Sequence, residues 1–424
     1  MHAQDSVAVV GAGVIGSAVA YALAREGRRV VLIDRAFPGI AGASFGNAGH
    51  IGTEFVAPLP SPQLLLGLWR ELFALGGPLD IPLRHLPEFM PWAARFAAAA
   101  FRREKNTAQL APLVRPAVVT LERWLQELRC ADLLRRNGHY EIWLNRRAHQ
   151  KAQQQAHAMG KLSVRTAAAP PELLQAVQAA AGATNAAGVW FPDSGHVIDP
   201  LEVVRAFAAG AVERGAQIRR ADVSALKPAA TGIEVAAGEE SCTVGSAVVC
   251  AGAWSAKLLA PLGLSVPLES VRGYHVELPQ HAPLIDAPVV HANEQLIVTP
   301  MAGRLRASSY MEFLPPEAPP DARKPLRLRQ TLRALGYDCE SEGRSWVGGR
   351  PVLPDYMPGI GRAPGTAVLY AIGHQHIGLT IAAVTAELIA DMVAQRQPRH
   401  PVAAFDLQRF GASRMPAGLP EAVR

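Results

Sequence analysis

The pattern that most restricts the fold lies at the start of the chain. An apolar, β-branched run over 6–10 leads directly into Gly11-Ala12-Gly13-Val14-Ile15-Gly16, and a helix is predicted over 17–26. A second apolar run, 29–33, ends on Asp34. A strand, a glycine-rich turn, a helix and a second strand that ends on an acid form the βαβ unit of dinucleotide-binding folds.

The residue types in this unit fit the chemistry of a dinucleotide. Gly11 permits the tight turn, Gly13 lets the backbone approach a pyrophosphate, and Gly16 lets the helix pack on the strand. The N–H groups at the start of the helix, around 14–15, can bind the phosphates. Asp34 can accept hydrogen bonds from ribose hydroxyls. The unit alone does not separate NAD from FAD.

Two later turns rich in small residues favour a flavin. The apolar run 247–251 continues into Gly252, so that the end of a strand can lie against a bound dinucleotide. Near the C-terminus, residues 371–380 predict a strand, a small-residue loop and a helix that begins near Leu379. N–H groups at the start of that helix would stabilise the negative charge of a reduced flavin.

Composition and charge indicate a globular chain without a nucleic-acid partner. The 424 residues are 49% apolar and 18% charged, and this length favours two domains. The net charge of +6 is dispersed among acids rather than gathered in a stripe. The four cysteines are far apart, so we expect buried, inert thiols and no metal site. With neither a signal peptide nor an apolar run of about 20 residues, the chain is predicted to be cytoplasmic, or at most peripheral to a membrane.

Beyond the opening unit, the pattern predicts a nucleotide-binding fold interrupted by a second domain. Residues 63–165 are predicted to form helices broken by Pro82, Pro87 and Pro91, with a short strand near 140–144. The apolar part of this region, 63–75, is expected to pack in a core or lid rather than against a membrane. Short alternating strands over 271–311 predict an antiparallel sheet.

Motifs from both ends of the chain together resemble a known family. They are the opening unit with Asp34, then 43–50, Trp190-Phe191-Pro192, 249–255, Arg272-Gly273-Tyr274, Gly349-Arg350-Pro351 and 373–380. The set resembles the D-amino-acid oxidase superfamily of FAD-dependent oxidoreductases, and most of all its bacterial D-amino-acid dehydrogenase branch of the small-subunit type. Each motif alone is unspecific, whereas the combination is specific.

The resemblance implies an α/β fold with a Rossmann-type, glutathione-reductase-like FAD-binding domain, a substrate domain on a mixed or antiparallel sheet, and a helical insertion. The FAD-binding domain would take 1–60, 188–265 and 345–400, the substrate domain 61–187 and 266–344, and the tail 401–424. Relatives with covalent flavin carry a cysteine near the equivalent of 349–351. None is present there, so FAD is expected to be bound noncovalently.

The same resemblance implies which residues contact the cofactor. Ser44, Asn47, Ala48 and Gly49 would lie along the pyrophosphate and the flavin, and the backbone of Val223 would meet the adenine. The complete set expected at the cofactor is Gly11, Gly13, Val14, Ile15, Gly16, Asp34, Arg35, Ser44, Asn47, Ala48, Gly49, His50, Val223, Ala251, Gly252, Trp254, Gly349, Arg350, Gly373, His374, Gly378, Leu379 and Thr380.

Four residues are expected at the substrate. Arg350 is the principal candidate, because a planar, permanently charged guanidinium pairs with a carboxylate through two hydrogen bonds. The alternative for Arg350 is an ion pair with a structural acid. Tyr274 is expected either to contact the carboxylate or amine or to pack in the sheet. His50 and His374 are expected near the flavin, as partners of the ring or substrate or as structural side chains.

These features predict oxidative deamination of D-amino acids by hydride transfer from the α-carbon to flavin N5. Electrons would pass to a quinone, another carrier or oxygen. Within the same chemistry, the substrate could instead be D-proline, cis-4-hydroxy-D-proline, glycine or sarcosine. Two alternatives belong to other classes: an FAD-binding subunit of a multi-subunit dehydrogenase without independent turnover, and an NAD-dependent dehydrogenase.

Overall fold

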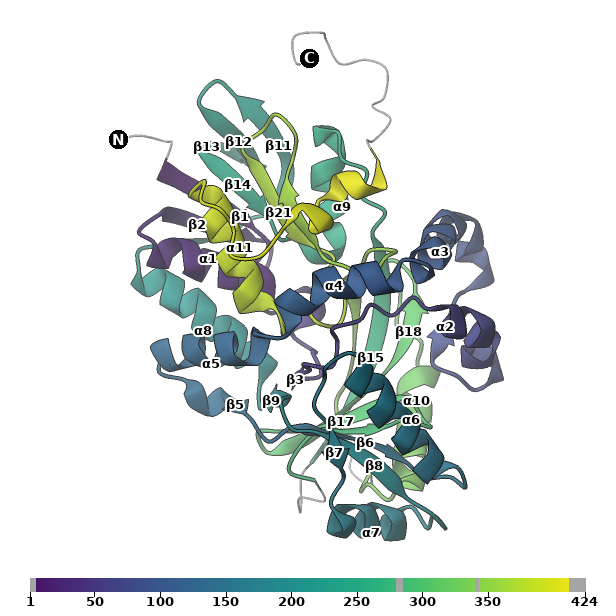
Figure 1. Cartoon of the computed structure of the whole chain (residues 1–424). Helices are drawn as coiled ribbons and strands as arrows, with labels where there is room; N and C mark the ends of the chain where they lie inside the picture. Colours follow the sequence, from purple (N-terminus) through teal and green to yellow (C-terminus); the bar gives the residue numbers. More distant parts are fainter. Residues whose placement is uncertain (1–4, 280–284, 340–342, 412–424) are drawn as a thin grey trace.

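Two large β-sheets organise the chain. The computed structural model describes residues 5–279, 285–339 and 343–411, so most of the expected tail, 412–424, lies outside the described residues. In the view of Figure 1, a six-stranded sheet lies in the upper part and a nine-stranded sheet in the lower part. Helix α4 (Arg103–Val114) crosses the middle of this view.

The six-stranded sheet is the predicted nucleotide-binding sheet. Neighbouring strands are parallel except for the last pair, which is antiparallel. In spatial order its strands are β10 (Gln217–Arg220), β2 (Arg29–Asp34), β1 (Ser6–Val10), β14 (Ser246–Val249), β21 (Val368–Ile372) and β20 (Gly359–Arg362). The parallel strands end at one edge, where this class of sheet binds its ligands.

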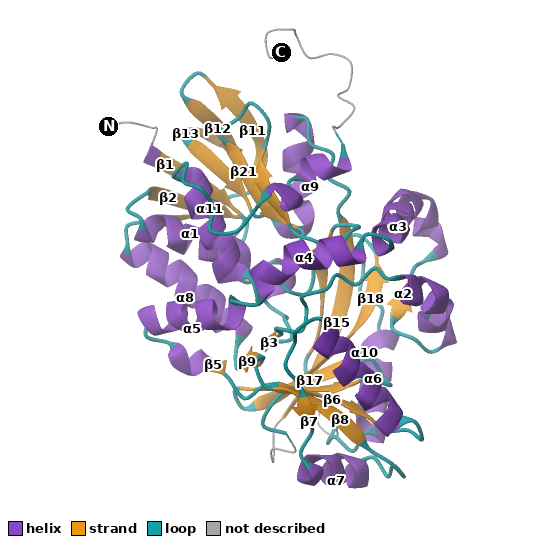
Figure 2. Ribbon diagram, in the orientation of Figure 1, coloured by secondary structure: helices purple, strands orange, loops and turns teal. Residues whose placement is uncertain are grey.

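Both faces of this sheet are covered, which explains its continuous apolar runs. Val7 and Val9 pack on the side of α1 (Val14–Arg25), α8 (Pro200–Glu213) and α11 (Ala382–Val393). Ala8 and Val10 pack on the other side, against a small antiparallel sheet. That sheet consists of β11 (Val223–Ala229), β12 (Gly232–Ala237) and β13 (Glu240–Val244). Figure 2 shows α1, α8 and α5 (Ala117–Glu127) one below another beside the six-stranded sheet.

Helix α1 begins earlier than predicted. Its first residue is Val14 rather than 17, so the last glycine of the motif, Gly16, lies inside the helix. Gly16 needs to be a glycine because a Cβ there would overlap the carbonyl oxygen of Gly11. The small residues of α1 are buried against α8 and α11. The opening turn, the helix and the first strand are therefore one tightly packed unit.

The nine-stranded sheet is mixed, as the resemblance implied. Its pairs are antiparallel except β16 with β6 and β18 with β4. In spatial order its strands are β19 (Ser345–Val352), β15 (Glu269–Pro279), β18 (Arg304–Phe313), β17 (Leu296–Met301), β16 (Val289–His291), β6 (His139–Trp143), β8 (Ala187–Phe191) and β7 (Ala167–Ala168), and β4 (Leu79–Asp80) pairs with β18. Helices α10 (Arg323–Ala334) and α6 (Ala148–Lys161) pack on it.

Two boundaries of the expected domain division do not match the sheets to which the neighbouring strands belong. Strands β8 and β19 belong to the nine-stranded sheet, whereas the division at 188 and 345 assigned them to the FAD-binding part. The reason is backbone pairing, since Glu269–Val276 pairs with Ser345–Val352 along the whole length of β19. The rest of the division stays a prediction.

The helical insertion is present, but proline does not break it where expected. Helix α3 (Leu86–Ala100) contains both Pro87 and Pro91. Pro87 lies in the first turn, where its missing N–H costs nothing, whereas Pro91 removes one internal hydrogen bond without ending the helix. The remaining helices are α2 (Pro62–Gly67), α7 (Pro171–Ala180) and α9 (Ser255–Leu259).

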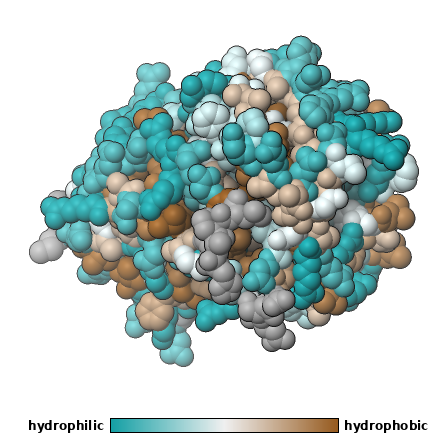
Figure 3. Space-filling view, turned by 90° about the horizontal axis from the view of Figure 1, so that it is seen from below, coloured by the Kyte–Doolittle hydropathy of each residue, from teal (hydrophilic) through white to brown (hydrophobic). Residues whose placement is uncertain are grey.

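A fourth sheet has three strands, with β9 (Gly195–Val197) between β3 (His50–Ile51) and β5 (Leu134–Arg135). Over the lower face of the molecule, hydrophilic side chains are interspersed with apolar ones (Figure 3). Among the described helices, none combines the length and the apolar composition that crossing a bilayer requires.

Candidate functional site

A cavity of about 380 Å³ opens where the parallel strands of the six-stranded sheet end. Its volume lies in the usual range for ligand sites, roughly 300–1,000 Å³. We call it the strand-end cavity. Many residues expected at the cofactor line it: Gly11, Gly13, Val14, Ile15, Asp34, Arg35, Ser44, Asn47, Val223, Ala251, Gly252, Trp254, Gly349, Gly373, His374, Gly378 and Leu379.

The middle of the strand-end cavity suits an anionic group. Gly11 has φ +104°, and a Cβ there would overlap the backbone of Cys250 at the end of β14. Gly13 precedes α1 without capping it through a side chain, and Ser44 Oγ accepts from Val14 N at 2.9 Å. The positive end of α1 therefore faces a surface kept clear by glycine, which is the arrangement that binds a pyrophosphate.

One end of the cavity suits a ribose and an aromatic base. Asp34 accepts from Ala12 N at 2.6 Å and from Ala36 N at 2.9 Å. These two bonds orient the carboxylate and leave lone pairs for further donors. Val223 lines the same end, and the guanidinium of Arg35 lies 4.0 Å above the ring of Trp254. The donor and acceptor groups present therefore fit the adenosine part of a dinucleotide.

The other end of the cavity is formed by Ser44, Asn47 and the turn after β21. Gly373 has φ +67°, and His374 next to it is buried, with Nε2 3.2 Å from Thr385 Oγ1. Burial lowers the pKa of His374 to about 3, so its imidazole is neutral at ordinary pH. Helix α11 begins at Ala382, three residues after the predicted start, and a turn forms the rim.

Several predicted cofactor residues do not line the cavity: Gly16, Ala48, Gly49, His50, Arg350 and Thr380. Gly16 serves helix packing, as described above. Gly49 packs against the Val197 carbonyl and Met301, so its lack of a side chain serves the fold. Sequence reasoning in turn missed lining residues such as Asp222, Lys257 and Gln375, which carry no motif.

Arg350 lies on β19 between two residues that line the cavity, Gly349 and Pro351. Its guanidinium lies against Gly273 of β15, where a Cβ would overlap it. Nη1 donates to the Tyr310 carbonyl at 3.2 Å. In the described part of the chain, no carboxylate forms an ion pair with Arg350. Burial lowers the pKa of the guanidinium, but an arginine stays charged. Arg350 is therefore a half-buried cation with no carboxylate partner among the described residues.

Aromatic side chains from three distant segments gather near Arg350. The ring of His376 lies 4.6 Å from that of Phe55 and 6.5 Å from that of Tyr356. Burial, and then the charge of Arg350, lower the pKa of His376 to about 4. His376 follows the predicted site residue His374 by two positions, and this closeness is a signal by which it could have been predicted as a site residue. Phe55 and Tyr356 give no signal in the sequence.

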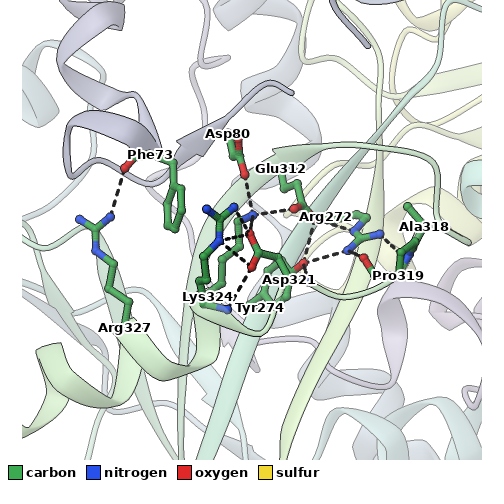
Figure 4. Close-up of polar contacts among 11 residues, drawn as sticks. Phe73, Asp80, Arg272, Tyr274, Glu312, Ala318, Pro319, Asp321, Lys324 and Arg327 are labelled. Carbon is green, nitrogen blue, oxygen red and sulfur yellow. Dashed lines mark hydrogen bonds and ion pairs between the residues drawn. The ribbon is translucent and has the colours of Figure 1, made fainter. Parts of the chain in front are cut away.

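Tyr274 is not brought to the cavity. Its hydroxyl donates to Glu312 Oε2 at 2.9 Å and accepts from Arg272 Nη2 at 2.8 Å, within the polar cluster of Figure 4. Lys324 of α10 completes this cluster (Figure 4). Neighbouring residues of a strand face opposite sides. Because Arg350 lies against Gly273, Tyr274 faces the side covered by α10. Of the two alternatives expected for Tyr274, these contacts match packing in the sheet.

His50 also lies outside the cavity, in a buried group with Glu54 and His139. Its Nε2 is 3.6 Å from Glu54 Oε1. Burial lowers the pKa of His50 to about 3, with His196 and His376 adding to the effect. Burial raises the pKa of Glu54 to about 8. His50 is therefore a neutral histidine in the interior rather than a partner of the cofactor.

The fold and the strand-end cavity together define a dinucleotide-binding protein with a second sheet beside the site. The family described as FAD dependent oxidoreductase (DAO) matches residues 6–392. The chain belongs to this family, and its cofactor is FAD.

Two relatives that match nearly the whole chain agree with this assignment, and two solved structures share its fold. A D-amino-acid oxidase of Bradyrhizobium diazoefficiens is 31% identical, over 95% of this chain and 98% of its own. A D-amino acid dehydrogenase 2 of Pseudomonas aeruginosa is 30% identical, over 92% and 95%. The crystal structure of glycine oxidase from Geobacillus kaustophilus has a TM-score of 0.75 at 21% identity, over 95% and 98%. The L-proline dehydrogenase of P. horikoshii has a TM-score of 0.71 at 18% identity, over 97% and 98%.

We expect acid or heat precipitation to release the flavin into the supernatant. Cys250 is the cysteine that lines the cavity, at the Gly11 end, and burial raises the pKa of its thiol. A buried, protonated thiol is a poor nucleophile, so no covalent link to the flavin should form. The flavin absorbance of the supernatant and of the pellet measures how much flavin is released. Yellow colour that stays with the precipitated protein would contradict noncovalent binding.

Proposed function

We propose that this FAD-dependent oxidoreductase oxidises D-amino acids at the α-carbon. The observation that carries the proposal is Arg350, a half-buried guanidinium beside the flavin site that forms an ion pair with no carboxylate among the described residues. A partly desolvated cation of this kind is stabilised by an anionic ligand, and an amino-acid carboxylate matches the planar guanidinium through two hydrogen bonds. The D-amino-acid enzymes among the relatives support the same substrate class.

The residues around Arg350 bind and orient the substrate in this proposal. Arg350 fixes the carboxylate, and Phe55, Tyr356 and His376 form an aromatic wall for the rest of the molecule. Since His376 is neutral at ordinary pH, it does not repel an amino group. Holding the reacting atoms in one geometry can supply a large part of the rate. The wall also keeps water away from the reacting bond.

The reaction needs little acid–base assistance from the protein. When bound, FAD supplies the two-electron acceptor, flavin N5, for the hydride that leaves the α-carbon. The nitrogen lone pair of the neutral amine forms the carbon–nitrogen double bond. The imino acid then leaves and is hydrolysed by water to an oxo acid and ammonia, or persists when the substrate is cyclic.

A panel of amino acids under anaerobic conditions tests the substrate class. We expect D-amino acids to bleach the flavin absorbance of the purified chain, and their L-enantiomers to leave it unchanged. Glycine, sarcosine, D-proline and cis-4-hydroxy-D-proline belong in the panel, because glycine oxidase and L-proline dehydrogenase share the fold. Faster bleaching by one of these four would replace the proposed substrate. No bleaching by any compound, with or without a dye acceptor, would favour a subunit without independent turnover.

The electron acceptor is proposed to be a quinone or another carrier, with oxygen reacting slowly. The relatives named D-amino acid dehydrogenase support this expectation. Dye-coupled turnover should exceed hydrogen peroxide formation in air for the same substrate and enzyme concentration. Equal rates would identify the chain as an oxidase, as for the Bradyrhizobium relative.

Peripheral contact with a membrane belongs to the same proposal, since a quinone is dissolved in lipid. Large apolar side chains are exposed in the helical insertion, namely Leu66 (82%), Trp69 (58%) and Leu83 (85%). Side chains of this kind insert into the interfacial region of a bilayer. The exposure of Leu66 and Trp69 also shows that only part of the apolar stretch 63–75 packs in a core. The sequence pattern had favoured packing in a core or lid for the whole stretch.

A further inference from the structure

A buried group of two histidines and one carboxyl lies outside the flavin site. His50 belongs to β3, Glu54 follows it by four residues, and His139 begins β6. The side chains of these three residues are 6%, 10% and 3% exposed. They come from two segments far apart in the sequence. The group therefore joins the segment 50–55 to the nine-stranded sheet.

The three side chains place their ligand atoms around one point. Glu54 Oε1 lies 3.6 Å from His50 Nε2 and 3.7 Å from His139 Nε2. One ligand atom from each residue can be chosen so that all three lie within 4.8 Å of one another. Neighbouring ligand atoms of a tetrahedral zinc ion are about 3.4 Å apart, given bonds of about 2.1 Å. The two histidine–glutamate separations are within a few tenths of an ångström of this value, whereas the two imidazole nitrogens lie within 4.8 Å of each other.

Hydrogen bonding within the group is incomplete. Separations of 3.6 and 3.7 Å are too long for hydrogen bonds, and His50 Nε2 is buried without a partner. Glu54 Oε2 accepts from Ser194 Oγ at 3.0 Å, which leaves Oε1 facing the two imidazoles. A second hydrogen-bonded residue that orients a ligating carboxylate is typical of metal sites.

We propose that His50, Glu54 and His139 bind one zinc ion. Two imidazole nitrogens and one carboxylate oxygen are a ligand set that zinc takes in proteins, with the fourth position left to water. The ion would fasten the segment 50–55 to β6 and so fix Phe55 against His376. This site is independent of the proposed substrate, because neither Arg350 nor the strand-end cavity contributes a ligand.

In a second group of acidic residues, a lysine takes the place that a metal ion would occupy. Asp80, Glu312 and Asp321 also place their oxygens close together. There, however, Lys324 Nζ lies 2.6, 2.5 and 3.2 Å from the three carboxylates and occupies the place of a cation (Figure 4). At Glu54, no described lysine or arginine forms an ion pair with the carboxyl group. The Asp80 group already has a protein cation, whereas Glu54 has none among the described residues. This comparison favours a metal ion at the His50 group and not at the Asp80 group.

Zinc content tests the proposal directly. Tag-free holoenzyme from zinc-supplemented cultures should contain about one zinc ion per chain by mass spectrometry. Glu54→Gln and His139→Gln should each contain less than about a tenth of that amount. Glu141→Gln is the matched control, since Glu141 is a half-buried carboxyl whose pKa burial likewise raises, to about 7, but it bonds to Gln155. The control should keep its zinc.

A measurement on the wild-type chain tests the proposal even if the variants fail to fold. Wild-type holoenzyme is warmed with a chelator until zinc is removed, and Zn²⁺ or Mg²⁺ is then added back. The melting temperature should fall on removal and recover with Zn²⁺ but not with Mg²⁺, while flavin absorbance stays constant. Wild-type protein without zinc after supplementation, or equal zinc in wild type and Glu54→Gln, would overturn the proposal.

Discussion

Replacing Arg350 by lysine or methionine is expected to lower kcat/KM for a D-amino acid at least about thirtyfold. When a carboxylate stays buried without its partner, the loss is about 2–5 kcal/mol. Lysine keeps the charge but cannot form two parallel hydrogen bonds in one plane. Steady-state kinetics with the D-amino acid that bleaches the flavin fastest gives the ratio.

Flavin content and melting temperature should change little in the Arg350 variants. Arg362→Lys is a suitable control, because Arg362 also donates to a backbone carbonyl, that of Met392, but lies on β20. It should keep wild-type kcat/KM. Titration with a carboxylate inhibitor such as benzoate, followed by flavin absorbance, should show weaker binding only in the Arg350 variants. Loss of flavin or unfolding would make Arg350 structural, and normal turnover would assign the carboxylate to another residue.

Replacing Lys324 by methionine is expected to lower the free energy of unfolding by about 3–5 kcal/mol. Lys324 is fully buried and bonds to Asp80 and Glu312 (Figure 4). Burial alone would lower its pKa, but the bonds to Asp80 and Glu312 raise it. Without the ammonium group, the carboxylates would remain buried together without their shared cation. Chemical denaturation followed by tryptophan fluorescence measures the loss.

Two further variants separate this effect from a general effect of losing a lysine. Lys151→Met removes an exposed lysine of α6 and should leave the denaturation midpoint unchanged. Adding Asp80→Asn to Lys324→Met removes one of the stranded charges and should recover part of the stability. A midpoint of Lys324→Met equal to that of the wild type would show that the cluster does not stabilise the fold.

The features predicted correctly are those written in consecutive residues. The turn from Gly11 to Gly16 and the acid Asp34 follow local rules, because a tight turn, a close approach and a helix start each require particular residues in order. The strand-end cavity is accordingly lined by Gly11, Gly13 and Asp34, whereas Gly16 serves helix packing. The alternating pattern over 271–311 indicated antiparallel strands, and the mixed character of the whole sheet was implied by the family resemblance.

Side-chain direction and long-range assembly were not predictable in the same way. Tyr274 was expected either at the substrate or packed in the sheet, and which of the two applies depends on the side of β15 that it faces: Gly273 faces Arg350, and Tyr274 faces the opposite side. Phe55, Tyr356 and His376 come from three segments that meet only in the folded chain. No spacing in the sequence indicates that these three side chains lie close together in the fold. Pro91 inside α3 shows packing overriding a local preference.

The attachment of β19 to the turn after β21 bears on how substrate preference can change. Val352 forms a bridge with His374, and Gln375 N donates to the Pro351 carbonyl at 3.0 Å. The strand that carries Arg350 is thus joined by backbone hydrogen bonds to the rim of the flavin site. Mutations at Phe55, which belongs to a segment not joined to β19 in this way, would therefore change the pocket wall without acting on the strand that carries Arg350. A library built there would vary the pocket while the carboxylate anchor keeps its alignment with the cofactor.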